Sequence, residues 1–399
     1  MEIVYLDTAA TSRKKPEGVY EAMDRFMRNV GASPGRSVHR LGIRASRLVA
    51  DTREKVARLL GADDASRVVF TLNCTEALNL AIKGILKPGD HVVTSSVEHN
   101  SVMRPLSAMM QERGIGVTRV RADASGMTDP DDIRKSIQPQ TALIVMTHAS
   151  NVTGAIQPIE ECGRIAREHS IPFLVDAAQT VGYIPIVLRR LPVDMLAFSG
   201  HKGLMGPQGV GGLYIRKGID LTPLRQGGTG SASSEEIQPE ILPDKYESGT
   251  PNTPGLAGLS AALDVIASIT VEEIRASLCR VGRILLKGLR AIDGVVVYGP
   301  HDMDRNVGVF SFTVEGQDPA EVATELDSRY GIMTRVGLQC APSAHRAIGT
   351  FPEGTIRASI GYYTTTEEVE YFLRSLKEIE YAQRLLHRDI SIHAPRTAG

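Results

Sequence analysis

The chain has 399 residues, with 45 lysines and arginines against 46 aspartates and glutamates and no block of like charge. A chain of this length is expected to bury about three quarters of its unfolded surface, and its balanced charge predicts no nucleic-acid or membrane partner. No apolar run approaches the ~20 residues of a bilayer span, and Met1 to Val4 lack the profile of a signal peptide. We therefore predict a cytoplasmic protein that acts on a small molecule.

Alternating strand and helix patterns fill the chain from about residue 43 to residue 215. Most of the strands are separated by segments long enough for a crossover helix, which predicts an α/β fold with a mostly parallel sheet between layers of helices. The strand at 211–215 follows its predecessor too closely for such a crossover and is expected to run antiparallel. The predicted strands are 67–71, 91–95, 116–121, 141–147, 172–176, 193–198 and 211–215.

The second half of the chain has a different pattern. Residues 218–253 are rich in Gly, Ser, Pro and acidic residues, and a loop this long is usually functional or disordered; we predict a functional loop. A helical stretch from Pro254 to about Ile292 follows. After it we predict strands near 295–298, 307–314, 332–335 and 355–359 and a final helix at about 366–387. We predict three parts: an N-terminal segment (1–15) packed against the small domain, a large domain (16–253) and a small α+β domain (254–399).

Cysteine and histidine spacing gives no support for a metal site. Cys74, Cys162, Cys279 and Cys340 are irregularly spaced, which indicates reduced thiols rather than a disulfide framework. The ten histidines are scattered, with no pair spaced for one face of a helix. We predict an enzyme whose cofactor is not a metal.

Lys202 is the most informative residue of the chain. It lies in the polar turn Ser199-Gly200-His201-Lys202, between an apolar run and a glycine-rich segment whose backbone can approach a planar ligand closely. Asp176 ends the preceding strand, where its carboxylate can face a protonated pyridine nitrogen. Ligands of open α/β sheets bind at the carboxyl ends of strands, so the pair predicts pyridoxal 5'-phosphate with Lys202 as the Schiff-base amine. Taken singly, Lys202 is better explained as a surface charge and Asp176 as a helix N-cap.

Three further turns offer contacts for the phosphate and the ring. Residues 71–76 join a strand to a helix, which places backbone N–H groups near Cys74 and the Thr75 hydroxyl at a helix N-terminus that can bind phosphate. His99 begins another helix and can stack on a flat heterocycle. Asn151 follows a strand and can reach a ring hydroxyl or a substrate carboxylate. The alternatives are simple capping for Thr75, a cap or core position for His99, and an ordinary turn for Asn151.

Cys340 and Arg357 are candidates for handling a substrate. Cys340 lies in a turn rather than an apolar run, and a thiol there becomes nucleophilic where a cation or helix N-terminus stabilises the thiolate. Arg357 lies within a short strand pattern, where its guanidinium is unexpected unless it meets a carboxylate. Alternatively, Cys340 is incidental and Arg357 is a surface charge on an edge strand.

Together these motifs resemble the cysteine desulfurases of the class V aminotransferase group, which also contains the selenocysteine lyases. The resemblance extends from about Tyr5 to Tyr363. The motifs that carry it are, in order, Asp7 to Thr11, Thr75-Glu76, Glu98-His99, Asn151 to Gly154, Asp176 to Gln179, Ser199 to Lys202, Gly249 to Asn252, Cys340 and Arg357.

The resemblance implies a fold-type I pyridoxal phosphate enzyme that acts as a homodimer. Lys202 would bind the cofactor covalently, Asp176 would pair with its pyridinium nitrogen, and His99 would stack on its ring. Gln179 would contact the ring oxygen. The phosphate would be held by Thr75, Ser199 and His201, with Thr250 supplied by the other subunit. Arg357 and Asn151 would hold the substrate carboxylate.

The resemblance also implies a reaction. L-Cysteine would be converted to L-alanine, with His99 as a proton carrier and with a persulfide on Cys340 that is passed to an acceptor protein. Three alternatives remain at this point: a selenocysteine lyase, a class V aminotransferase or β-lyase in which Cys340 is incidental, and a non-catalytic scaffold with the same fold.

Overall fold

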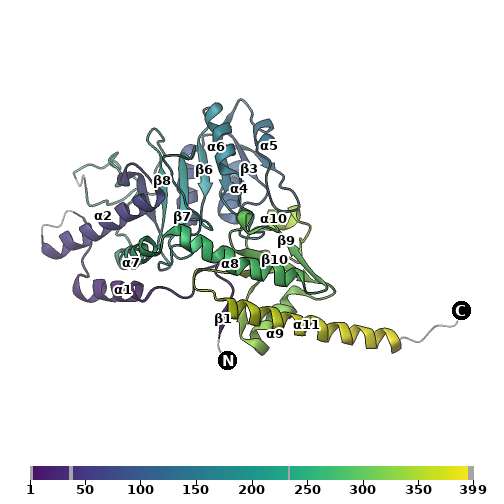
Figure 1. Cartoon of the computed structure of the whole chain (residues 1–399). Helices are drawn as coiled ribbons and strands as arrows, with labels where there is room; N and C mark the ends of the chain where they lie inside the picture. Colours follow the sequence, from purple (N-terminus) through teal and green to yellow (C-terminus); the bar gives the residue numbers. More distant parts are fainter. Residues whose placement is uncertain (1–2, 36–38, 232–233, 394–399) are drawn as a thin grey trace.

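The computed structural model describes residues 3–35, 39–231 and 234–393 (Figure 1). Residues 1–2 of the predicted N-terminal segment and 394–399 of the predicted small domain lie outside the described residues, and the three-part division stays a prediction. The elements are β1 (Val4–Tyr5), α1 (Glu17–Asn29), α2 (Arg40–Leu60), β2 (Val68–Thr71), α3 (Cys74–Ile85), β3 (His91–Ser95), α4 (Asn100–Arg113), β4 (Gly116–Val120), α5 (Pro130–Lys135), β5 (Thr141–Thr147), α6 (Ile159–Glu168), β6 (Phe173–Asp176), β7 (Met195–Ser199), β8 (Gly211–Ile215), α7 (Thr253–Ile269), α8 (Val271–Arg290), β9 (Val295–Tyr298), β10 (Val309–Val314), α9 (Pro319–Tyr330), β11 (Ile332–Met333), β12 (Arg335–Gly337), α10 (Pro342–Ala347), β13 (Thr355–Ser359) and α11 (Thr366–His393).

The large sheet has seven strands in the order β2-β8-β7-β6-β5-β3-β4. Its strands β4, β3, β5, β6 and β7 run parallel, whereas β8 is antiparallel to both of its neighbours, β7 and β2. The predicted α/β fold and the antiparallel last strand are therefore confirmed. Glycine is needed in β8 because a Cβ atom at Gly211 would lie 2.6 Å from the backbone of Asn73, just before α3.

Helices cover both faces of this sheet, and the strand sequences explain why. In β5, Leu143 and Val145 belong to a core cluster shared with α3 and α4, whereas Ile144 and Met146 belong to a second cluster shared with α2 and α6. Successive side chains of a strand point to opposite faces, so an unbroken apolar strand must be buried on both sides.

The second half of the chain forms a smaller antiparallel sheet in the order β12-β13-β10-β9. The single strand predicted at 332–335 is wrong, because the segment contains two short strands in different sheets: β11 pairs with β1, and β12 pairs with β13. The continuous helix predicted from Pro254 to Ile292 is also divided. Thr270 has a φ of 77°, its hydroxyl accepts the Glu273 N–H as the N-cap of α8, and α7 and α8 meet at 78°.

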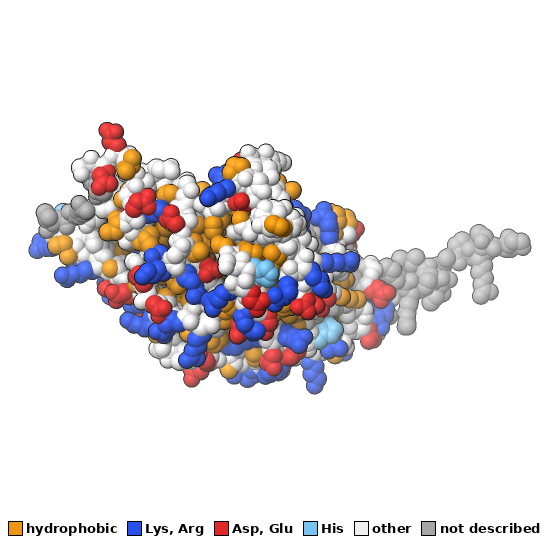
Figure 2. Space-filling model, turned by 90° about the horizontal axis from the view of Figure 1, so that it is seen from above, with side chains coloured by type: hydrophobic (Ala, Val, Ile, Leu, Met, Phe, Trp, Pro, Cys, Tyr) orange, Lys and Arg blue, Asp and Glu red, His pale blue; other side chains and the backbone are white. Residues whose placement is uncertain are grey.

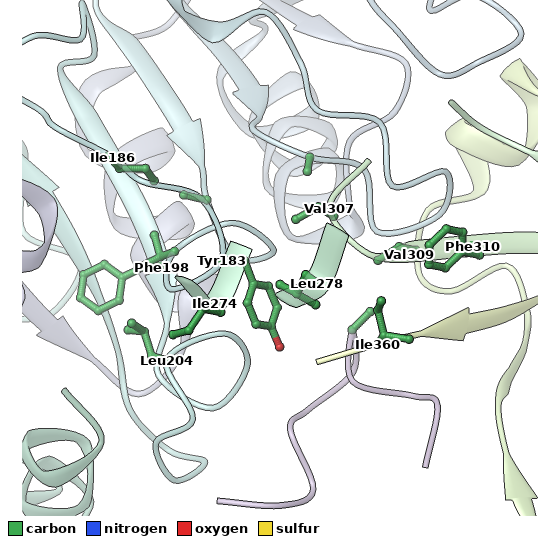
Figure 3. Close-up of a cluster of buried hydrophobic side chains, with 14 of the residues drawn as sticks. Tyr183, Ile186, Phe198, Leu204, Ile274, Leu278, Val307, Val309, Phe310 and Ile360 are labelled. Atoms are coloured by element: carbon green, nitrogen blue, oxygen red, sulfur yellow. The ribbon is translucent and has the colours of Figure 1, made fainter. Parts of the chain in front are cut away.

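One hydrophobic core joins the two sheets (Figure 3). The ring of Tyr183 lies among side chains from the large sheet, from α8 and from the chain around the small sheet. The labelled residues of this region are Tyr183, Ile186, Phe198, Leu204, Ile274, Leu278, Val307, Val309, Phe310 and Ile360. Because interiors pack at near-crystalline density, this shared core fixes the small sheet against the large one.

Acidic and basic side chains are interspersed over the face shown in Figure 2, in line with the near-zero net charge. Among the described residues, no single helix is long and apolar enough to cross a membrane. The bent pair α7 and α8 reaches the required length and apolar composition only when the two helices are taken together.

Candidate functional site

A pocket opens at the carboxyl edge of the parallel strands. Thr147 ends β5 and Asp176 ends β6, and the two residues are directly paired across the sheet, while Ser199 ends β7. The pocket holds about 500 Å³ of space not filled by atoms, part of it open to solvent. Nine residues predicted from the sequence line it: Cys74, Thr75, His99, Asn151, Asp176, Gln179, Ser199, His201 and Lys202.

Lys202 and Asp176 form the electrostatic centre of the pocket. Asp176 is 4% exposed, and its Oδ1 accepts the backbone N–H of Ala178 at 3.0 Å. Burial lowers the pKa of Lys202, although the negative charge of Asp176 opposes that shift. Lowering this pKa favours the neutral amine, which is the form that can attack an aldehyde.

The beginning of α3 provides a cradle for an anion. Thr75 is exposed to the pocket in the first turn of this helix, where free backbone N–H groups attract negative charge. Ser199 Oγ is buried and has no hydrogen-bond partner in the described structure. A buried hydroxyl without a partner is costly, so an anion that accepts its hydrogen bond fits this side of the pocket. The phosphate of pyridoxal phosphate has the required charge and acceptors.

Cys74 lies beside the Asp176 carboxylate. Its Sγ donates to Asp176 Oδ1 at 3.4 Å, and burial together with the Asp176 charge raises the pKa of the thiol well above its usual range. Cys74 is therefore a neutral donor in the pocket and not a nucleophile.

His99 is both a helix cap and a pocket residue. Its Nδ1 accepts the Ser101 N–H at 3.0 Å as the N-cap of α4. Burial lowers the pKa of His99, although the charge of Asp176 opposes this shift, so the neutral ring is favoured. With Nδ1 as the acceptor, Nε2 carries the proton. The cap and the stacking roles considered from the sequence are therefore compatible in one side chain.

The N-terminal segment is hydrogen-bonded to two residues that line the pocket. The Gln179 side chain donates to the carbonyl of Ala9 at 3.1 Å, and His201 Nδ1 lies 3.0 Å from Thr11 Oγ1. Burial, with the charges of Lys202 and Lys15, lowers the pKa of His201 to about 4, so its ring is neutral at physiological pH.

Arg357 does not line the pocket but lies behind it. It lies on β13, which is paired on both sides, so the edge-strand alternative is wrong. Its side chain is 3% exposed and donates to Asp7 Oδ1 at 2.6 Å and to the carbonyl of Asn151 at 3.0 Å, whereas its buried Nε has no partner. Burial is the largest cause of the lowered pKa of Lys202, and the positive charge of Arg357 also lowers it.

Cys340 lies in an exposed turn tied to the pocket wall. Its carbonyl accepts the Asn100 N–H at 2.8 Å, and the preceding carbonyl, that of Gln339, accepts the Asn151 side-chain amide at 2.7 Å. The turn is therefore bonded to the residue after His99 and to a lining residue of the pocket.

Thr250 is a third predicted site residue that does not line the pocket, after Arg357 and Cys340. Thr250 is exposed near the end of the long segment 218–252, whose described residues form neither helix nor strand. It lines a separate hollow together with Arg53 and Glu247. Among the described residues no group of His, Cys, Asp or Glu is arranged to hold a metal ion.

Sequence reasoning missed two residues near the site. Asp7 was part of a motif, but nothing local indicates that its partner would be a residue 350 positions away. Glu98, the residue before His99, is fully buried, and its Oε1 accepts hydrogen bonds from Ser95 Oγ at 2.5 Å and from the Thr147 N–H at 2.9 Å. Glutamates are almost never fully buried unless they are paired, so nothing local in the sequence indicates the burial of Glu98.

Comparisons with known proteins agree with this geometry. Residues 4–372 match the family model described as aminotransferase class-V. The chain is 37% identical over 382 residues to a protein of Methanothermobacter thermautotrophicus described as "Probable cysteine desulfurase", with 94% of each chain covered. It is 35% identical over 393 residues to "Cysteine desulfurase IscS" of Dictyoglomus turgidum, again with 94% of each covered. The apo structure of a cysteine desulfurase from Thermococcus onnurineus NA1 matches with a TM-score of 0.90 at 36% identity, covering 95% of each chain.

The mixed, mostly parallel sheet between helices is the fold of the fold-type I transferases. The chain belongs to the aminotransferase class-V family and falls with its cysteine desulfurases. The resemblance predicted from the ordered motifs is thus confirmed, while the role of each site residue stays a prediction.

Removing the charge of Asp7 should destabilise the protein. Asp7→Asn leaves the Arg357 guanidinium buried without a counter-charge, which typically costs about 3 kcal/mol in the free energy of unfolding. Urea unfolding measures the loss. The matched control is Asp24→Asn, which breaks an exposed pair with Arg28 and should cost about 0.5 kcal/mol or less. Equal losses in the two variants would show that the buried pair contributes no more than the exposed one.

Glu98 should make stability depend on pH. Burial raises the pKa of Glu98 to about 8 from its ordinary value of 4.5, although the hydrogen bonds from Ser95 and Thr147 oppose the shift. Between these values the folded state keeps a proton that the unfolded state has lost, so stability falls as pH rises from about 4.5 to about 8.

Glu98→Gln removes this titration, so the variant should gain stability relative to the unaltered protein as pH rises. Urea unfolding at pH 5, 6.5 and 8 measures the difference, with exposed Glu54→Gln as the matched control. A difference that stays constant with pH would contradict the raised pKa.

Proposed function

We propose that this protein is a pyridoxal phosphate-dependent cysteine desulfurase that converts L-cysteine to L-alanine and passes the sulfur to an acceptor through Cys340. The observation that carries the proposal is the buried Lys202 amine in one pocket with Asp176, beneath a turn that exposes Cys340. The relatives named as cysteine desulfurases support it over nearly the whole chain.

The residues of the pocket fit the cofactor from three sides. Asp176 offers a carboxylate for the pyridinium nitrogen, and Thr75, Ser199 and His201 surround a place for the phosphate. His99 presents a neutral ring for stacking, and Gln179 and Cys74 complete the wall. When bound, pyridoxal phosphate supplies an electron sink that stabilises negative charge on the substrate carbon.

The chain's own groups bind the substrate and move its protons. Asn151 and Arg357 would hold the carboxylate of L-cysteine: Asn151 lines the pocket, and Arg357 lies behind it with a buried Nε that has no partner. Lys202 Nζ, whose pKa is lowered by burial, accepts the Cα proton, and His99 Nε2 donates and recovers a proton.

Sulfur transfer is assigned to Cys340. Its thiolate attacks the sulfur of the bound substrate, so an S–S bond forms as the Cβ–S bond breaks. The electron pair of the broken bond remains on Cβ, which takes up a proton and becomes the methyl group of alanine. Cys340 is left as a persulfide, and an acceptor thiol or a reductant removes the outer sulfur.

We infer that the working unit is a cytoplasmic homodimer. Thr250 is exposed on the long segment before α7 and lines a hollow away from its own pocket. This position supports a role in the neighbouring site, where Thr250 of the partner subunit would donate to the cofactor phosphate.

Borohydride reduction should fix the cofactor to Lys202. In the holoprotein, reduction followed by peptide mapping is expected to label the peptide that carries Lys202. Lys202→Ala should abolish the label because, among the described residues, Lys202 is the one lysine that lines the pocket. Lys15→Arg is the matched control, since burial lowers the pKa of Lys15 to about 8 although it does not line the pocket. A label at any other lysine would refute the proposed cofactor site.

Replacing Cys340 should stop sulfur transfer without removing the cofactor. Cys340→Ala should lose at least roughly a hundredfold in alanine formation from L-cysteine and a thiol reductant, because the nucleophile is gone. Its cofactor absorbance should match that of the unaltered protein. Buried Cys279→Ala is the control and should keep its activity.

A fully active Cys340→Ala would instead favour a β-lyase or aminotransferase reaction in which this thiol has no part. Activity retained with L-selenocysteine but lost with L-cysteine would favour a selenocysteine lyase, because selenium release need not involve the thiol.

A further inference from the structure

The turn that carries Cys340 has a backbone that requires external support. Gln339 has a φ of 41° and Cys340 a φ of 58°, so two consecutive residues with side chains adopt the left-handed conformation. Each such residue costs roughly 1–2 kcal/mol relative to a right-handed one. Neighbouring contacts must therefore hold the turn in place.

The Gln339 side chain supplies the contacts. It is buried, with 7% exposure, although the next residue is exposed. Its Nε2 donates to the carbonyl of Thr355 at 2.9 Å, at the start of β13, and its Oε1 lies 2.7 Å from His345 Nε2 in α10. Both ends of the amide are thus bonded to the two elements that follow the turn.

The orientation of the amide is fixed by a further bond. His345 Nδ1 lies 2.7 Å from Thr350 Oγ1, and burial, with the charge of Arg357, lowers the pKa of His345 to about 4. The ring is therefore neutral at physiological pH. Since Gln339 Nε2 is already a donor to Thr355, Oε1 must accept, so His345 Nε2 carries the ring proton and Nδ1 accepts the Thr350 hydroxyl.

The backbone of the same turn is bonded to the pocket on its other side. The Gln339 carbonyl accepts the Asn151 amide, and the Cys340 carbonyl accepts the Asn100 N–H. Gln339 and Cys340 are therefore bonded on two sides. The Gln339 side chain is bonded to α10 and β13, and the carbonyls of both residues are bonded to Asn151 and Asn100 at the pocket.

We propose that Gln339 is a positioning residue that holds Cys340 in one place at the mouth of the pocket, through its amide bonds to Thr355 and His345. The expected effect on kcat rests on the proposed function, whereas the expected effect on the position and reactivity of the Cys340 thiol does not. The thiol meets the substrate sulfur from a fixed turn, and an acceptor must approach that turn.

The test compares two isosteric variants in the holoprotein. Gln339→Met keeps the shape but loses both bonds, and Gln339→Glu keeps the acceptor for His345. Cys74, Cys162 and Cys279 are buried, so iodoacetamide reports on Cys340 among the chain's four cysteines. Exposed Gln140→Met is the matched control and should behave as the unaltered protein.

In Gln339→Met we expect the Cys340 alkylation rate to change at least about threefold and kcat for L-cysteine to fall at least about tenfold, because a small misplacement of a reacting atom costs that much or more. KM and the cofactor spectrum should stay unchanged, since Arg357 and the pocket are intact. Gln339→Glu should recover part of both losses.

Unchanged alkylation and unchanged kcat in Gln339→Met would overturn the proposal, as would parallel changes in KM and the cofactor spectrum. A change in alkylation in a protein that never turns over L-cysteine would uphold the role of Gln339 in placing the thiol and refute the proposed function. Should Gln339→Met fail to fold, Thr350→Val tests the same chain of bonds from its far end, and unchanged alkylation and kcat there would likewise overturn the proposal.

Discussion

The buried guanidinium of Arg357 is the constraint on which the arrangement of the site depends. It lies on the small sheet, pairs with Asp7 of the N-terminal segment and donates to the carbonyl of Asn151 beside the large sheet. A charge buried to this degree must keep its partners, because isolating it would cost several kcal/mol. The N-terminal segment, the small sheet and the edge of the large sheet are therefore held together beside the pocket, and the shared core maintains the same geometry.

The same enclosure sets the chemistry of the pocket. Burial lowers the pKa of Lys202 and of His99, and in both residues the negative charge of Asp176 opposes the shift. The shifts favour the neutral amine that a base requires and the neutral imidazole that a proton carrier requires. In an open, solvated cleft these groups would return toward their ordinary pKa values, so the function follows from the depth of the site as much as from its residues.

Local patterns predict most of the strands and helices, and together with the family resemblance they predict nine of the residues that line the pocket. The apolar strands and the residues that end them are short-range features, so Asp176, Ser199 and Lys202 could be assigned to one edge before the sheet order was known. What the sequence could not provide were relationships between distant positions. The Asp7 partner of Arg357, the separation of β11 from β12 and the division of the helix at Thr270 depend on tertiary packing or on a single backbone angle.

The turn at Cys340 illustrates why exposure and order are compatible here. A thiol that must meet both a buried substrate and an external acceptor cannot be enclosed. In a flexible turn, however, the thiol would adopt many positions and would rarely lie in the geometry that the reaction requires. The preceding residue, Gln339, meets the need for order, because its buried side chain is hydrogen-bonded to Thr355 and His345. Cys340 itself stays exposed and accessible to an acceptor. The strained backbone of the two residues is maintained by these bonds, which also place the exposed thiol next to the pocket that His99 and Asn151 line.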